Sequence, residues 1–211
     1  MGDTEQNRSI GTKGRGNGTS DLFVSNSDNV GKILDGSDFS RCAAESVSFR
    51  SCRFERVRLA GSRIRKLDLD SVVLLGCDLA NVEWEESILA KVEMDECRMT
   101  GIGIPDAAIK ECLFRSCEMK MASFRAARLK TSRFVGCGLR GADFQRADLR
   151  GTAFEDCDLR DVQFSFAKLE GAVLCGCAIE GMQVRMDDLR GAVVDSSQAA
   201  YLAGLMGLVI R

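Results

Sequence analysis

The sequence predicts an all-β solenoid, and a five-residue repeat is the first reason. A large apolar residue stands at every fifth position from Leu34 to Val194, and no unit is lengthened or shortened. Ala44 and Trp84 are the only centres that are not Leu, Ile, Val, Phe or Met. Neither the helical period of 3.6 nor the strand alternation of 2 gives this spacing. A fixed period held over many units indicates a stacked repeat architecture.

A second regularity, at twenty residues, predicts that four units make one coil. Identical residues recur at this interval and would form columns if residues i and i+20 were neighbours. The columns are Cys77, Cys97, Cys117, Cys137, Cys157 and Cys177; Ala107, Ala127, Ala147 and Ala167; Phe114, Phe134 and Phe154; and, on the opposite side, Phe124, Phe144 and Phe164.

The most regular stretch, Cys137 to Gly191, resembles a known repeat family. Its units include Ala-Asp-Phe144-Gln-Arg and Ala-Asp-Leu149-Arg-Gly, close to the consensus Ala-Asp/Asn-Leu-X-X of the pentapeptide-repeat family. This resemblance implies a right-handed quadrilateral β-helix, with the apolar centre and the small residue two places before it pointing inward. About eight coils, each rising by roughly 4.8 Å, would give a rod near 40 Å long.

Composition argues against an enzyme. The chain has 211 residues, 45% hydrophobic and 28% charged, with a net charge of −2, as expected of one ordinary domain. It contains no histidine, the commonest general base and metal ligand. There is also no Gly-x-Ser-x-Gly motif and no phosphate-binding loop. We therefore expect no catalytic residue, no cofactor and no metal.

Ten cysteines invite a disulfide or metal interpretation, but the repeat favours another. All except Cys175 occupy the small position two residues before a centre, where Ala, Ser, Thr and Val stand in other units. Cysteine at such a position acts as a small buried apolar residue. We expect reduced thiols and a cytoplasmic location.

The two ends depart from the repeat. Residues 1–20 are polar and glycine-rich, which predicts a disordered leader, either native or a remnant of expression. The β-helix is expected over residues 21–195, with Leu22, Phe23 and Val24 closing its first coil. Residues 196–211 are expected to form a C-terminal segment, which contains too few apolar residues in a row to span a membrane.

The C-terminal segment predicts a helix followed by a short strand. Asp195 to Gln198 has the pattern of a helix N-cap, Ala199 to Met206 is compatible with a helix, Gly207 suits its end, and Leu208 to Ile210 suits a strand. Gln198-Ala199, Leu202 and Gly207-Leu208 resemble the tail of the family's quinolone-resistance branch, in which this segment pairs two rods end to end. The residues expected to dimerise are Tyr201, Leu202, Leu205, Met206, Leu208, Val209 and Ile210. A monomeric cap on the last coil is the alternative.

Charges sort by the four sides of the coil, which we call side A (centres 34, 54, 74 and onward), side B (39, 59), side C (44, 64) and side D (49, 69). Opposite charges twenty residues apart on sides B, C and D predict ladders that favour one stacking register. Side A carries an excess of acids that we expect to be unpaired, because the coil before Glu93, Asp95 and Glu96 presents Val73, Leu75 and Gly76. Glu93, Asp95, Glu96, Glu155 and Asp156 are therefore the candidate partner-binding residues.

The resemblance to the quinolone-resistance branch also implies a function. It implies a non-enzymatic DNA mimic that binds a type II topoisomerase, DNA gyrase, and protects it from poisons such as fluoroquinolones. A general protein-interaction or structural rod without this target is the alternative, since a fold does not fix a function. Direct nucleic-acid binding is disfavoured, because Arg125, Arg128, Lys130 and Arg133 lie on three different sides.

Overall fold

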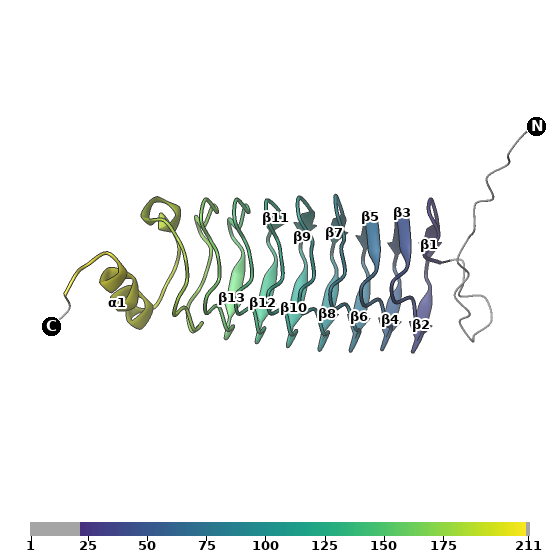
Figure 1. Ribbon diagram of the computed structural model, residues 1–211, viewed down its shortest axis with the longest axis horizontal. Helices are drawn as coiled ribbons and strands as arrows, with labels where there is room; N and C mark the ends of the chain where they lie inside the picture. The colour runs from purple at the N-terminus through teal and green to yellow at the C-terminus, as the bar shows by residue number, and fades with distance from the viewer. Residues whose placement is uncertain (1–21, 210–211) are drawn as a thin grey trace, which may run out of the picture.

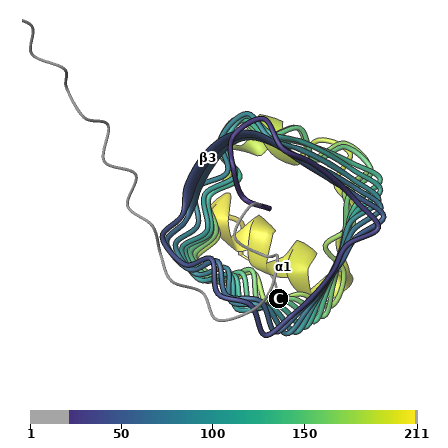
Figure 2. The ribbon, with the colours of Figure 1, turned by 90° about the vertical axis from the view of Figure 1, so that its right-hand side faces the viewer.

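A computed structural model describes residues 22–209 as a straight rod of stacked coils with a helix at its C-terminal end (Figure 1). Seen along its axis, the rod has four sides, and the helix lies across the open square of the last coil (Figure 2). The leader predicted over residues 1–20 and the last predicted contact residue, Ile210, lie outside the described residues. The all-β solenoid and the C-terminal helix are confirmed.

The strands form two parallel sheets on neighbouring sides of the rod. Side D carries β1 (Asp28–Val30), β3 (Ala43–Arg50), β5 (Arg63–Asp70), β7 (Ile88–Ala90), β9 (Ala108–Lys110) and β11 (Arg128–Lys130), of which β3 and β5 begin on side C. Side A carries β2 (Ile33–Asp35), β4 (Arg53–Glu55), β6 (Val73–Leu75), β8 (Glu93–Asp95), β10 (Leu113–Arg115), β12 (Arg133–Val135) and β13 (Ala153–Glu155). Every strand pair joins residues i and i+20, as the columns predict.

The regular strands cover fewer layers than the predicted eight coils. The sheet on side D has six strands and the sheet on side A has seven. Outside these strands the same register continues as isolated parallel bridges. They run along sides B and C and reach Val173↔Val193 on side A.

The corners of the coil require an unusual backbone. The second residue after every centre from Leu34 to Ile179 has a positive φ, in glycines such as Gly101 (+69°) and also in Lys66 (+56°) and Thr131 (+51°). A left-handed conformation costs a non-glycine residue roughly 1–2 kcal/mol. Inward packing of the two residues that flank each corner must offset this cost in every unit.

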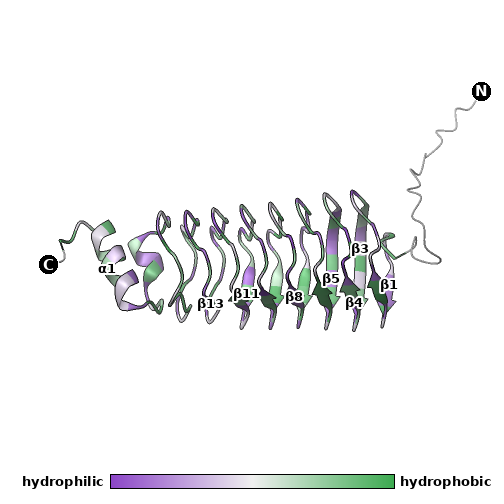
Figure 3. Cartoon of the chain, turned by 90° about the horizontal axis from the view of Figure 1, so that it is seen from below, coloured by the Kyte–Doolittle hydropathy of each residue, from purple (hydrophilic) through white to green (hydrophobic). Residues whose placement is uncertain are grey.

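The interior confirms the predicted ladders. Phe114, Phe134 and Phe154 stack with centroid distances of 4.6 and 5.0 Å and nearly parallel rings. The opposite column of Phe124, Phe144 and Phe164 stacks at 4.9 and 5.5 Å, and the two columns meet edge to face. Figure 3 shows apolar and polar residues following one another along β3 and β5, because centres point inward and their neighbours outward.

Each end of the rod is covered by apolar residues. At the N-terminal end Leu22 and Phe23 are buried. The ring centroid of Phe23 lies 4.6 Å from that of Phe39 and 4.9 Å from that of Phe49. The predicted third member, Val24, is exposed. At the C-terminal end lies helix α1 (Ser196–Leu205), which begins with the predicted capping box of Asp195 and Gln198.

The last coil departs from the sequence repeat. Met186–Leu189 forms a 3-10 helix, η1, although the apolar centres continue in register through Leu189 and Val194. Asp188 accepts a hydrogen bond from the backbone N–H of Phe166 at 2.8 Å, so the turn is bound to the coil before it. Leu189 still packs against the core.

Candidate interaction surfaces

The cysteines are free thiols, and most of them are buried. All ten are unpaired thiols, and all except Cys42 and Cys175 are buried. The buried thiols contact backbone carbonyls, as Cys97 does with Leu74 O at 3.6 Å. Burial raises the pKa of Cys112 to about 11. Hydrogen bonding to Cys117, together with burial, raises the pKa of Cys137 to about 12. These thiols are protonated at neutral pH and are poor nucleophiles.

Within residues 22–209 no group of three or more Cys, Asp or Glu side chains is arranged to hold a metal ion. In the same part of the chain, no helix has the length and apolar character needed to cross a bilayer.

Side A corrects one premise of the sequence analysis, namely that its acids lack partners. Asp95 pairs with Arg115 at 3.3 Å, and Glu155 pairs with Arg133 at 2.8 Å. Arg115 lies on the coil after Asp95, whereas Arg133 lies on the coil before Glu155. Arginine is also long enough to reach a carboxylate that is not directly opposite.

The remaining candidates on side A are free of ion pairs. Glu93, Glu96 and Asp156 have no basic partner within ion-pair distance among the described residues. Four apolar side chains of the same face are half-buried rather than exposed, and these are Val73, Leu75, Leu113 and Val135. The predicted strip therefore contains fewer unpaired acids and less exposed apolar surface than the sequence suggested.

Sides B and C are largely self-neutralised by ladders that the sequence predicted. On side B, Asp38 pairs with Arg58 at 3.0 Å, and Asp78 pairs with Arg98. On side C, Arg63 pairs with Glu83 at 2.8 Å.

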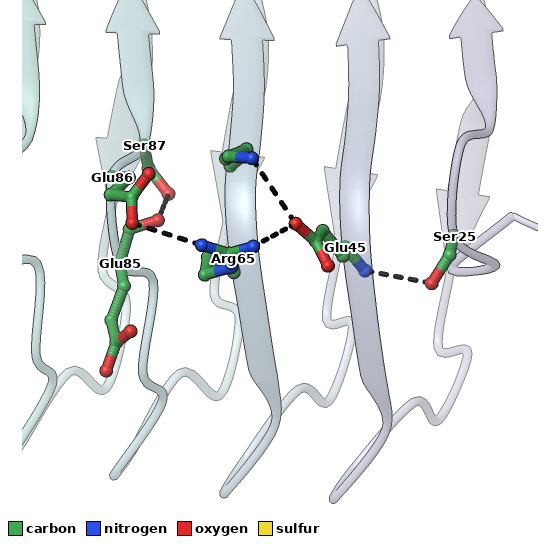
Figure 4. Close-up of polar contacts among 7 residues, drawn as sticks. Ser25, Glu45, Arg65, Glu85, Glu86 and Ser87 are labelled. Carbon is green, nitrogen blue, oxygen red and sulfur yellow. Dashed lines mark hydrogen bonds and ion pairs between the residues drawn. The ribbon is translucent and has the colours of Figure 1, made fainter.

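The N-terminal part of side C holds a connected charge network over a shallow hollow. Arg65 contacts Glu45 of the preceding coil and, at 3.3 Å, Glu86 of the following coil, and Lys66 adds a 3.4 Å contact to Glu45 (Figure 4). These contacts lower the pKa of Glu45, the hydrogen bond from Lys66 having the largest effect. The hollow of about 420 Å³ lies over the small residues Ala43 and Ala44.

Side D differs from the ladder that its sequence predicts. Arg128, Asp148 and Lys168 do lie on successive coils. Asp148, however, pairs with Arg150 of its own unit at 2.6 Å, and the hydrogen bond from Arg150 lowers the pKa of Asp148. Arg128 and Lys168 make no ion pair with another described residue.

The C-terminal segment divides the predicted dimer residues into two groups. Tyr201 and Leu202 pack on their own last coil, and the Tyr201 hydroxyl accepts a hydrogen bond from Gly181 N at 2.7 Å. Gln198 donates to the carbonyls of Leu174 and Cys177 at 2.7 and 2.8 Å. The other described members are exposed: Leu205, Met206, Leu208 and Val209. Leu208 and Val209 are not in a strand.

Comparison with solved structures finds several proteins that are similar to this chain. HetL, a pentapeptide repeat protein of the cyanobacterium Nostoc involved in heterocyst differentiation regulation, is 16% identical over 82% of this chain and 87% of its own, with a TM-score of 0.49. Full-length QnrB1, a plasmid-mediated fluoroquinolone resistance protein, is 15% identical over 86% of this chain and 100% of its own, with a TM-score of 0.34. A pentapeptide repeat protein of the Arabidopsis thaliana thylakoid lumen is 27% identical over 47% of this chain and 69% of its own, with a TM-score of 0.42.

No curated protein is detectably similar to the chain in sequence. Residues 107–184 match the family model described as a pentapeptide repeat region. The chain therefore carries a pentapeptide repeat region, and the structure extends its five-residue register back to Leu34.

Proposed function

We propose that this chain is a non-enzymatic rod that binds a type II topoisomerase, DNA gyrase, by imitating duplex DNA, and that it protects the enzyme from poisons such as fluoroquinolones. The observation that carries the proposal is the group of unpaired acids on side A, Glu93, Glu96 and Asp156. A basic DNA-binding groove attracts such a strip from a distance. The resemblance of the C-terminal segment to the quinolone-resistance branch points to the same target.

Glu93 and Glu96 are the strongest contacts of this proposed surface. Glu93 on β8 and Glu96 directly after it are both exposed, and their neighbours on the preceding coil, Val73 and Gly76, carry no charge. Asp95 and Glu155 belong to the same strip, but each would have to exchange its arginine for a cation of the partner. We expect these two residues to contribute less than the unpaired acids.

The exposed end of the rod is the proposed dimer contact. Leu205, Met206, Leu208 and Val209 leave apolar surface uncovered beyond the last coil, and a second rod docked end to end would bury it. Tyr201 and Leu202 hold α1 on the last coil and are not themselves part of the proposed contact. The dimer would work in the cytoplasm, where ten free thiols stay reduced.

A general protein-interaction rod without a topoisomerase target is the second candidate. The observation that favours it is the ion pairing of Asp95 and Glu155, which neutralises part of the acidic strip.

The test is gyrase supercoiling with and without a fluoroquinolone, titrated with the full chain. We expect micromolar protein to change the response to the drug, and the paired substitutions Glu93→Lys and Glu96→Lys to abolish the change. Glu85→Lys with Glu118→Lys is the matched control, because it makes the same charge change on other sides at acids without an ion pair. If the parent chain has no effect on either activity or drug response, the interaction rod is the better account.

A further inference from the structure

Side D carries unpaired charges of both signs in separate places along the rod. Asp68 and Asp70, on β5, have no basic partner within ion-pair distance among the described residues. Burial and then the charge of Asp70 raise the pKa of Asp68. Further along the same side, Lys91, Arg128 and Lys130 have no acidic partner in the part of the chain that the structure describes. The acids and the bases are therefore both available for an external partner.

The position of Lys130 is unfavourable for the stability of the fold. Lys110 on β9 lies directly beside Lys130 on β11 in the strand register. Like charges directly opposite one another on neighbouring strands are destabilising. Elsewhere ion pairs such as Arg58–Asp38 and Arg63–Glu83 join one coil to the next. Arg128 has Asp148 beside it on the following coil, but Asp148 pairs with Arg150, so the ion pairs of this chain's own coils leave Arg128 and Lys130 unpaired.

An apolar centre separates the two charged clusters. Ile88 on β7 is 52% exposed, and its neighbour in register on β9 is Ala108. β7 and β9 lie between the acids of β5 and the unpaired bases of β11. The order along side D is therefore acidic, apolar and basic.

We propose that side D is a self-complementary surface through which two copies of this chain pair side by side in antiparallel orientation. The twofold axis would run parallel to the strands, between β7 and β9, so that β5 faces β11 of the second copy. Asp68 then opposes Arg128 of the partner subunit, and Asp70 opposes Lys130 of the partner subunit. Lys91 opposes Glu111 of the partner subunit, and Ile88 meets Ala108 of the partner subunit near the axis. Symmetry repeats each contact.

This register places both acids of β5 opposite bases of β11, and its one like-charge contact, Arg50 with Arg150 of the partner subunit, lies away from the axis. An axis placed on β7 brings Lys91 against Lys91 of the partner subunit. An axis placed on β9 brings Lys110 against Lys110 of the partner subunit and Ile88 against Arg128 of the partner subunit. Either shift places like charges at the axis and leaves Asp68 without a base opposite it, although an axis on β7 keeps Asp70 opposite Lys110 of the partner subunit. The pattern therefore favours the first alignment.

The contact is expected to be reversible and sensitive to salt. It rests on exposed charges around a small apolar centre, and such charges are screened beyond a Debye length of about 10 Å at 0.1 M salt. It uses none of the exposed residues at the C-terminal end, so variants can separate it from the proposed end-to-end contact. A strip of acids and bases with exposed Ile88 suits a polypeptide surface better than a nucleic-acid backbone, which presents acids only.

The test is a charge swap, measured by sedimentation velocity in a chain that also carries Leu205→Glu and Leu208→Glu to remove the end contact. One variant has Asp68→Arg and Asp70→Lys, and a second has Arg128→Asp and Lys130→Asp. We expect each variant alone to lose self-association, with the dissociation constant raised at least about tenfold. An equimolar mixture should regain it, because the two altered faces are complementary. Circular dichroism checks that each variant keeps its fold. If a charge-swap variant does not fold, the pair Asp68→Asn and Asp70→Asn is used in its place.

Three outcomes would overturn the proposal. The first is a parent chain that stays monomeric at high concentration and low salt. The second is association that the single variants leave unchanged, and the third is a mixture of folded variants that does not associate. Binding of an acidic peptide or an oligonucleotide to side D without any self-association would assign the surface to a different partner.

Discussion

Two blocks of coils in the same rod are stabilised differently. In the block from Leu113 to Phe164 the interior is uniform, because six phenylalanines stack in two columns. In the block from Ala43 to Trp84 the column on side C changes from Ala44 through Ile64 to Trp84. Ser62 Oγ and Trp84 Nε1 are buried there without a hydrogen-bond partner. We call these the Phe block and the mixed block.

On the surface, the ion pairs are more connected in the mixed block than in the Phe block. In the mixed block, Arg65 joins Glu45 and Glu86, so one network spans three successive coils (Figure 4). In the Phe block the ion pairs are separate from one another: Arg125–Asp143, Arg133–Glu155 and Arg140–Asp161 each join two coils, and Arg150–Asp148 and Arg160–Asp158 each lie within one unit. The comparison teaches that a repeat of one length can be held in register by its interior or by its surface, and that the interior contributes more free energy.

The largest expected effect is in the Phe block. Phe134 is fully buried and stacks on both Phe114 and Phe154. Phe134→Ala leaves a cavity between two rings and should lower the free energy of unfolding by about 3–5 kcal/mol. Urea unfolding followed by circular dichroism measures it. A loss below about 1 kcal/mol would mean that the ring columns do not stabilise this block.

The next effect concerns the cap that closes the Phe block. The Asp195 carboxylate accepts hydrogen bonds from Ser197 Oγ and from the backbone N–H groups of Gln198 and Gly176, and these bonds lower its pKa to about 2, the one from Ser197 having the largest effect. Asp195→Ala removes the cap and should lower the stability of α1, which urea unfolding followed by circular dichroism measures.

The same cap predicts a pH dependence. Because the folded pKa of Asp195 is depressed, its contribution is complete above the unfolded value of 3.8 and is lost as the pH falls towards about 2. The protection of α1 amides, relative to their intrinsic exchange rates, should therefore fall over this range in the parent chain. This fall should be absent in Asp195→Ala, and an identical profile in both chains would assign it to another group.

A smaller effect tests the interior of the mixed block. Trp84→Phe removes ring volume but also removes the buried Nε1–H group that lacks a partner. An unsatisfied buried donor costs about 1–3 kcal/mol, which offsets part of the lost packing. We expect a net change in unfolding free energy below about 1 kcal/mol in the same urea assay. A loss as large as that of Phe134→Ala would mean that the two interiors are equally well packed.

The smallest effect is that of a single surface pair. Arg58 contacts Asp38 on the preceding coil, and both side chains are largely exposed. Arg58→Ala should therefore change stability by about 0.2–1 kcal/mol, and less in high salt. Thermal unfolding at two salt concentrations checks this, and an effect that salt does not alter would point to lost packing of the arginine stem.

The interior could be predicted from the sequence almost residue by residue. The period of five fixes which residue of each unit points inward, and the period of twenty fixes its neighbours, so the Phe114 and Phe124 columns follow directly. The inward cysteines and the capping box of Asp195 and Gln198 follow from equally local rules. The backbone register determines which residues these side chains contact.

The surface was less predictable, because long charged side chains have several partners within reach. Asp148 contacts Arg150 of its own unit rather than Arg128, and Asp95 contacts Arg115 from the following coil. The 3-10 helix at Met186–Leu189 was missed since its apolar centre keeps the repeat spacing. No local residue pattern in this stretch indicates that the backbone changes from the coil to a 3-10 helix.

Amide hydrogen exchange, measured block by block at low salt and at 1 M salt, tests the central claim most directly. Salt should accelerate exchange in the mixed block, where charge networks join the coils, and leave the Phe block nearly unchanged and slower in both conditions. Equal protection of the two blocks, or an equal response to salt, would contradict the claim that the interior holds one block in register and the surface the other.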